Sequence, residues 1–102
     1  RHEGDLSPGE LCAAAARLLK FGGRFAVIYP APRALEMLRA MEEAGIAPKR
    51  LRTVQGVAGK PPKHVLMDGI RGAASGLHWM EPLILKDENG DYTPEWHRIY
   101  GM

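Results

Sequence analysis

Apolar residues near the start of the chain recur with helical spacing. Ser7 fits the N-cap of a helix, Pro8 fits its first turn, and Glu10 completes a Ser-x-x-Glu capping box. The adjacent glycines Gly22 and Gly23 can end it. The apolar stripe that would face the core is formed by Leu11, Ala14, Ala15, Leu18 and Leu19. This pattern predicts a helix over residues 7–20.

A contiguous apolar run follows the paired glycines. Residues 25–28 are Phe, Ala, Val and Ile, and Pro30 closes the run. A strand with one wet face alternates apolar and polar residues, whereas an unbroken run is typical of a strand covered on both faces. We therefore predict a strand over residues 24–29, in the interior of a parallel sheet.

Residues 32–70 show first helical spacing and then strand alternation. Leu35, Leu38 and Met41 recur with helical spacing, which predicts a helix over residues 32–44 that ends at Gly45. Apolar and polar residues then alternate over 50–57 and over 63–70, with a Gly-Lys-Pro-Pro turn between them. Strands joined by a loop of about five residues must pair antiparallel, so these two form a hairpin.

The last quarter of the chain, residues 77–102, has a weaker pattern. Pro82 interrupts an apolar stretch, an acidic turn spans 87–91, and Thr93-Pro94-Glu95 can begin a short helical turn. We expect this tail to pack on the domain through Trp79, Leu83, Leu85, Trp96 and Tyr100. The fold class is therefore α/β, with a mixed sheet and a packed C-terminal tail.

Composition indicates one ordered domain. The 102 residues are 45% hydrophobic and 25% charged, with a net charge of +2, which excludes a disordered chain. No apolar run approaches the roughly 20 residues of a membrane span, and no signal sequence is visible, so we expect a cytoplasmic protein without membrane contact. Cys12 is the single cysteine and reads as an apolar core residue. No histidine spacing suggests a metal site.

Basic residues gather around the predicted hairpin. Between positions 49 and 71 six lysines and arginines accompany one acid, Asp68. They are Lys49, Arg50, Arg52, Lys60, Lys63 and Arg71. Such a cluster can follow a phosphate backbone, as in RNA binding. The alternative is an ordinary solvated surface, because not all of these side chains can share one side of the hairpin.

The turns and the helix-strand order carry a family resemblance. A helix ending Leu18-Leu19-Lys20-Phe21-Gly22-Gly23, followed by a strand, a helix and a hairpin, resembles the C-terminal half of class I S-adenosylmethionine-dependent methyltransferases. That family usually has proline where this chain has Phe21. The resemblance implies a partial Rossmann-like methyltransferase layer.

Several ordered motifs narrow the resemblance to the tRNA adenine-N6 methyltransferase-like group. They are Arg1-His2-Glu3, Pro48-Lys49-Arg50-Leu51-Arg52, Gly59-Lys60-Pro61, the segment from Asp87 to Glu95, and Ile99-Tyr100-Gly101. Together they span essentially the whole chain. The resemblance implies that Arg1, His2 and Glu3 lie near the active site of the complete enzyme; the alternative is a frayed terminus.

The chemistry of that family would lie outside these residues. In the family, a Gly-rich loop that binds S-adenosylmethionine and an Asn-Pro-Pro-aromatic motif that grips adenine both precede the Arg-His-Glu segment. This chain has no Asn-Pro-Pro, its only asparagine is Asn89, and no Gly-rich turn follows its first strand. We therefore predict no catalytic residue, no bound cofactor and no activity for the chain alone.

Two functions remain open from the sequence. The first is a fragment of a methyltransferase acting on tRNA or RNA at adenine N6. The second is a non-catalytic module for nucleic-acid binding or assembly that uses the basic hairpin. In the family the first strand here pairs with an earlier strand, so residues 25–28 are left with an unpaired edge. We expect a homo-oligomer formed through that edge or through the face of the helix over 7–20.

Overall fold

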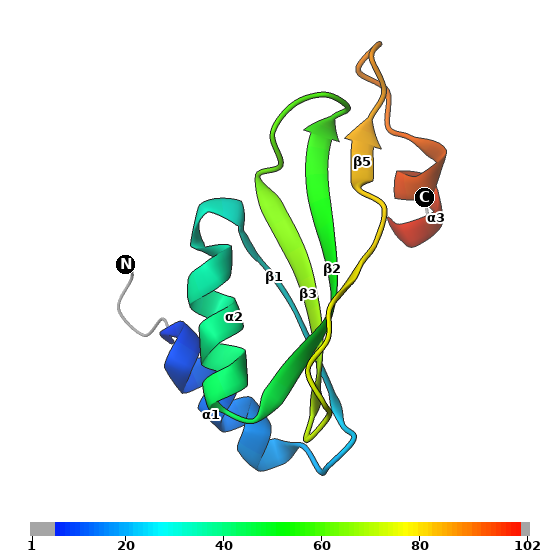
Figure 1. Ribbon diagram of the computed structural model, residues 1–102. Helices are drawn as coiled ribbons and strands as arrows, with labels where there is room; N and C mark the ends of the chain where they lie inside the picture. Colours follow the sequence, from blue (N-terminus) through cyan, green and yellow to red (C-terminus); the bar gives the residue numbers. More distant parts are fainter. Residues whose placement is uncertain (1–5, 101–102) are drawn as a thin grey trace.

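The computed structural model describes residues 6–100 (Figure 1). The expectation for Arg1, His2 and Glu3 lies outside the described residues. The elements are α1 (Pro8–Leu18), β1 (Arg24–Pro30), a 3-10 turn (Ala31–Arg33), α2 (Ala34–Glu43), β2 (Ile46–Val57), β3 (His64–Arg71), β4 (His78–Trp79), β5 (Leu83–Lys86) and α3 (Pro94–Tyr100). No helix within the described range is long and apolar enough to cross a membrane.

The strands form one mixed sheet. β3 lies between β1 and β2 and pairs antiparallel with both, which confirms the predicted hairpin. β4 and β5 lie beyond β2 and run parallel to it. The prediction that residues 24–29 form an interior parallel strand is wrong, because β3 is the only strand that pairs with β1 in the described chain.

The contiguous apolar run of residues 25–28 does not mean that both faces of β1 are buried. Phe25, Val27 and Tyr29 pack against the core, while Ala26 and Ile28 are exposed on the opposite side of β1. The strand thus has one covered face and one open face. Residues 25–28 are apolar on both faces, and Arg24 lies on the open one.

The two long helices cover one face of the sheet. α1 and α2 pack together against β1, β3 and β2 (Figure 1). The core lies between these helices and the sheet. It is built from Cys12, Met37, Met41, Ile46, Leu51, Val65 and Met67, all at most 7% exposed. Cys12 and Met37 join the two helices through a 3.7 Å contact between their sulfur atoms.

The start of α1 confirms the capping box. Ser7 Oγ accepts a hydrogen bond from the Glu10 amide at 3.1 Å, and the Glu10 carboxylate accepts one from the Ser7 amide at 2.9 Å. The helix ends at Leu18 rather than at residue 20, because Leu19 is already extended, with φ −89° and ψ 139°. Gly22 then turns the chain in the left-handed region, at φ 84°.

The second strand begins four residues before the predicted start at 50. Gly45 ends the helical segment at φ 81°, and β2 continues from Ile46 through Pro48. The pairing with β3 shifts register between Pro48 and Arg50, so proline lies at a bulge, where the missing amide hydrogen is tolerated.

The tail packs over β2, but not through every predicted residue. Leu83 is buried, and Leu85 and Trp96 are half-buried. Trp96 stacks on Tyr92 with ring centroids 4.1 Å apart. The expectation for Trp79 is wrong: this side chain is 65% exposed, because β4 has only two residues at the outer edge of β2. The Tyr100 side chain lies outside the described part.

Candidate functional site

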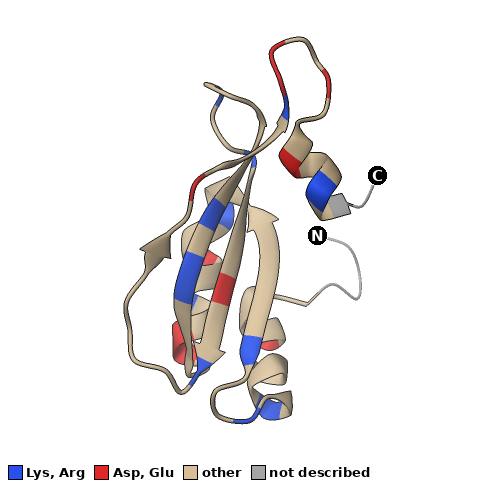
Figure 2. Ribbon diagram, turned by 90° about the vertical axis from the view of Figure 1, so that its right-hand side faces the viewer, with Lys and Arg blue, Asp and Glu red and all other residues tan. Residues whose placement is uncertain are grey.

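Within residues 6–100, no helix covers most of one face of the sheet. Figure 2 looks onto this face, with α1 and α2 behind the strands and α3 at one end. Since side chains alternate along a strand, the residues opposite the core share this face. By the strand register they are Arg24, Ala26 and Ile28 on β1, Leu66, Asp68 and Ile70 on β3, and Arg50, Arg52 and Val54 on β2. We call these residues the open face.

Asp68 is the polar centre of the open face. It lies on the middle strand, is 8% exposed, and is paired in register with Ala26 on one side and Arg50 on the other. Arg50 Nε donates to Asp68 Oδ2 at 3.1 Å, and Arg50 Nη2 donates to the same oxygen. Arg24 Nε lies 3.6 Å from Oδ1. Two cations therefore flank one carboxylate across three strands.

The second oxygen of Asp68 is left without a hydrogen bond. Oδ1 is buried and accepts no hydrogen bond from the described residues, since the approach of Arg24 is too long for one. Buried acceptors in native proteins are nearly always satisfied. This oxygen is therefore a candidate contact point for a donor outside the described chain.

Arg52 holds the tail against the end of the open face. Its Nη2 pairs with the Glu95 carboxylate of α3, and its Nε donates to the Glu81 carbonyl at 2.9 Å. The side chains of Arg52 and Glu95 are only 16% and 28% exposed. The Arg52 guanidinium thus already has two partners within the fold, Glu81 and Glu95.

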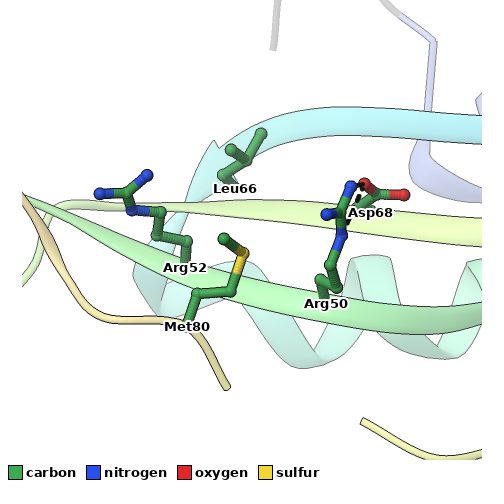
Figure 3. A pocket seen from close by; sticks show the side chains of 5 residues that line it. All are labelled: Arg50, Arg52, Leu66, Asp68 and Met80. Carbon is green, nitrogen blue, oxygen red and sulfur yellow. Dashed lines mark hydrogen bonds and ion pairs between the residues drawn. The ribbon is translucent and has the colours of Figure 1, made fainter. Parts of the chain in front are cut away.

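A small cavity lies between the two arginines. It has a volume of about 110 Å³ and is lined by Arg50, Arg52, Leu66, Asp68 and Met80. In Figure 3, Arg50 and Asp68 point toward one another, and the side chains of Leu66 and Met80 lie between Arg50 and Arg52. Pockets for small molecules measure about 300–1,000 Å³. This cavity can take a single side chain, not a nucleoside.

The six basic residues predicted to bind RNA do not gather at one place. Arg50 and Arg52 share the open face, while Lys60 and Lys63 are exposed at the turn between β2 and β3. Lys49 lies at the bulge.

The remaining two basic side chains contact carbonyl groups away from that turn. Lys49 Nζ donates to the Ala74 carbonyl at 2.9 Å. Arg71 Nη1 donates to the Leu19 carbonyl, and its guanidinium stands 4.7 Å from the centre of the Phe21 ring. Arg71 thereby joins the end of β3 to the end of α1.

Sequence reasoning missed Arg24 and the role of Asp68. In the sequence, Asp68 is only the one acid among six bases, and Arg24 lies outside that cluster. Arg24 and Asp68 come close only because β3 lies between β1 and β2. The alternation of residues along each strand does not reveal that strand order. The available signal was a lone acid within the otherwise uncharged segment of residues 65–70.

The strand-to-helix connection of the described residues differs from that of a nucleotide-binding fold. Rossmann-type folds hold a dinucleotide at a Gly-rich turn between a strand and the helix that follows. Here β1 leads into α2 through Pro30, Ala31 and Pro32. No group of three or more potential metal ligands occurs in the described chain. Burial raises the pKa of the Cys12 thiol, which does not suit a nucleophile.

Comparison with known proteins identifies the fold. No family model matches the chain, and no curated protein matches it. Among solved structures, it is similar to the crystal structure of a predicted O-methyltransferase, protein Atu636 from Agrobacterium tumefaciens, with a TM-score of 0.84 and 17% identity. The match covers 92% of this chain and 45% of that one, so the chain spans less than half of the matched protein's length. The chain therefore has a methyltransferase-like α/β fold with an open, mixed sheet.

Proposed function

We propose that this chain is the scaffold half of an S-adenosylmethionine-dependent methyltransferase domain that acts on adenine N6 in tRNA or RNA. The observation that carries the proposal is the arrangement of the sheet. An antiparallel β3 inserted between β1 and β2, with α1 and α2 on one face, superposes on under half of a predicted methyltransferase. The match covers 45% of that protein, which agrees with a chain that forms the scaffold part of such a domain and lacks the Gly-rich cofactor turn.

The choice of adenine N6 rests on the sequence motifs. The segments Pro48–Arg52, Gly59–Pro61 and Asp87–Glu95 resemble the tRNA adenine-N6 group. The structure places the first on β2 and the second in the β2–β3 turn. The structural neighbour is a predicted O-methyltransferase, a name that refers to methylation of oxygen. Methyl transfer to adenine N6 and to oxygen are therefore the two chemistries that an experiment has to separate.

The chain alone should not transfer a methyl group. The exocyclic amine of adenine is a weak nucleophile and must be held in line with the donor methyl group. The base must also leave its stack to be reached. The described residues offer neither a cofactor turn nor a cavity between Arg50 and Arg52 large enough for a nucleoside.

The test is a comparison of the complete translated reading frame with residues 1–102. Each is incubated with unfractionated tRNA and labelled S-adenosylmethionine, and the digested nucleosides are identified by mass spectrometry. We expect N6-methyladenosine from the complete protein and no product from residues 1–102. Product methylated on oxygen would contradict the substrate assignment, and product from residues 1–102 would contradict the scaffold role.

The exposed lysines of the β2–β3 turn favour a second candidate, RNA binding without catalysis. Lys60 and Lys63 are exposed and form no ion pair within residues 6–100. If they contact phosphates, a Lys60→Gln, Lys63→Gln double variant should weaken binding of a labelled RNA and reduce its salt dependence by about two released counterions. Lys20→Gln plus Arg39→Gln is the charge-matched control, because Lys20 is exposed just after α1 and Arg39 is exposed on α2.

A further inference from the structure

We infer that the C-terminal tail competes with RNA for Arg52. In the free chain the Glu95 carboxylate on α3 occupies the Arg52 guanidinium, and a phosphate of bound RNA displaces it. The inference rests on the proposed function for its ligand, because that function makes RNA the substrate. It adds an internal contact that weakens RNA binding until α3 is released.

The Arg52–Glu95 pair joins α3 to β2. Arg52 Nη2 donates to Glu95 Oε2, and the two side chains are only 16% and 28% exposed. A guanidinium forms charge-assisted hydrogen bonds of the same kind with a carboxylate and with a phosphate. The Glu95 carboxylate therefore stands where a phosphate of RNA would bind.

Arg52 lies close to the exposed lysines of the β2–β3 turn. Val54 follows it by two residues on the same face of β2, about 7 Å along the strand. The Val54 carbonyl accepts a hydrogen bond from the Lys63 amide at 3.3 Å. Residues 49–67 contain five lysines and arginines and no acid. Release of Arg52 would thus add a third cation to Lys60 and Lys63 at one end of the sheet.

The tail carries charge of the same sign as RNA. Residues 87–95 contain no lysine or arginine and four acids, Asp87, Glu88, Asp91 and Glu95. We call this segment the acidic tail. A polyanion at the β2–β3 turn would be attracted by the lysines and would repel the acidic tail. Binding of RNA at the turn and docking of the acidic tail on Arg52 therefore oppose each other.

α3 can leave the sheet without disturbing the buried core. It has seven residues, and a helix of this length is unstable without contacts to the rest of the fold. It packs beside β5 (Figure 1), while the core is formed by α1, α2, β2 and β3. The backbone amide and the hydroxyl of Thr93 donate to the Leu85 and Ile84 carbonyls at 2.9 and 2.6 Å. These bonds hold the start of α3, so the rest can swing away about Thr93.

The first test measures binding of labelled, unfractionated tRNA to the 102-residue chain at one fixed salt concentration. Glu95→Gln should bind about threefold to tenfold more tightly, because a neutral amide competes less with phosphate for Arg52. Glu88→Gln is the matched control. It removes the same charge from an exposed position of the same tail, and should change the affinity by less than about twofold. Equal gains from the two variants would overturn the inference.

The second test repeats both substitutions in an Arg52→Gln background. Because the inference makes Glu95 act through Arg52, Glu95→Gln should now give no larger gain than Glu88→Gln. If the threefold to tenfold gain persisted without Arg52, Glu95 would act on RNA by another route and the inference would be wrong.

The third test uses the unaltered chain and so does not depend on the folding of any variant. Hydrogen–deuterium exchange is measured with and without saturating tRNA. Peptides covering residues 94–99 should exchange at least about threefold faster with tRNA bound, because α3 loses its contacts with the sheet. Unchanged or slower exchange would show that α3 stays docked, and would overturn the inference.

The outcomes also separate the inference from the function on which it rests. If tRNA releases α3 but the complete translated reading frame forms no N6-methyladenosine, the proposed function fails and the inference stands. If N6-methyladenosine forms while α3 stays docked, the inference fails and the function stands. If neither the unaltered chain nor Glu95→Gln binds tRNA, the inference is wrong.

Discussion

Arg50 on β2 stands directly across from Asp68 on β3 and gives both its Nε and its Nη2 to a single oxygen, Oδ2. The pair joins the middle strand to its neighbour on the face that no long helix covers. Arg24 approaches the other oxygen from β1 at 3.6 Å. One carboxylate thus links three strands, and its Oδ1 accepts no hydrogen bond within residues 6–100.

The coupling between Arg50 and Asp68 can be measured with a double-mutant cycle. The variants Arg50→Ala, Asp68→Ala and the double variant should give a coupling free energy of about 1–2 kcal/mol in urea unfolding, because the carboxylate is mostly buried and the hydrogen bonds are charge-assisted. The Arg33–Glu36 pair is the control: its side chains are 53% and 49% exposed, and its coupling should be far smaller. Equal coupling for the two pairs would contradict the burial argument.

Gly69 should not tolerate a methyl group. A Cβ built there would lie 2.5 Å from Met41 Cε, 2.8 Å from Ile46 Cγ2 and 2.9 Å from the Ala47 carbonyl oxygen. The side chains can shift, but the carbonyl belongs to the paired strand. Gly69→Ala should therefore lower the free energy of unfolding by about 1–3 kcal/mol.

Gly56 provides the matched control for that substitution. It is also a strand glycine, and a Cβ there would meet nothing within 4 Å. Gly56→Ala should leave the stability unchanged or raise it by up to about 1 kcal/mol, since alanine restricts the unfolded chain. Similar losses at both positions would mean that the close approach of β3 to α2 is not as described.

Met67 should be the most sensitive residue of the middle strand. It is fully buried among the core residues of α1, α2 and β2. Met67→Ala should lower the free energy of unfolding by about 2–5 kcal/mol, through lost apolar burial and the cavity left behind. Leu18→Ala, at an 88% exposed position, should change it by less than about 0.5 kcal/mol. A smaller loss at Met67 than at Leu18 would contradict the assignment of the covered face.

Cys12 should behave as an unreactive thiol in the folded protein. Burial raises its pKa, so the thiolate fraction falls and the sulfur is shielded by Met37. A thiol reagent at neutral pH should label it at the rate of unfolding, and labelling should become immediate in denaturing urea. Rapid labelling of the native chain would show that α1 does not cover the sheet as described.

Local signals in the sequence were sufficient for the helices and the hairpin. The capping box at Ser7 and Glu10 is a short-range arrangement, and the structure reproduces it atom by atom. The turn between β2 and β3 fixes an antiparallel pair by its length alone. Such features depend on residues close together in the chain.

The order of strands could not be predicted from the same signals. β1 precedes β2 in the chain, yet β3 inserts between them, and the apolar run 25–28 gives no indication of which face is open. The contact of Asp68 with Arg24 and Arg50 follows only from that order. Trp79 was likewise assigned to the core by its size, although its two-residue strand leaves it 65% exposed.

The measurement that bears most directly on the scaffold assignment is equilibrium binding of radiolabelled S-adenosylmethionine. It is made in parallel on residues 1–102 and on the complete translated reading frame. The account predicts saturable binding to the complete protein and none above background to residues 1–102. Saturable binding to residues 1–102, lost when the chain is unfolded in urea, would contradict it.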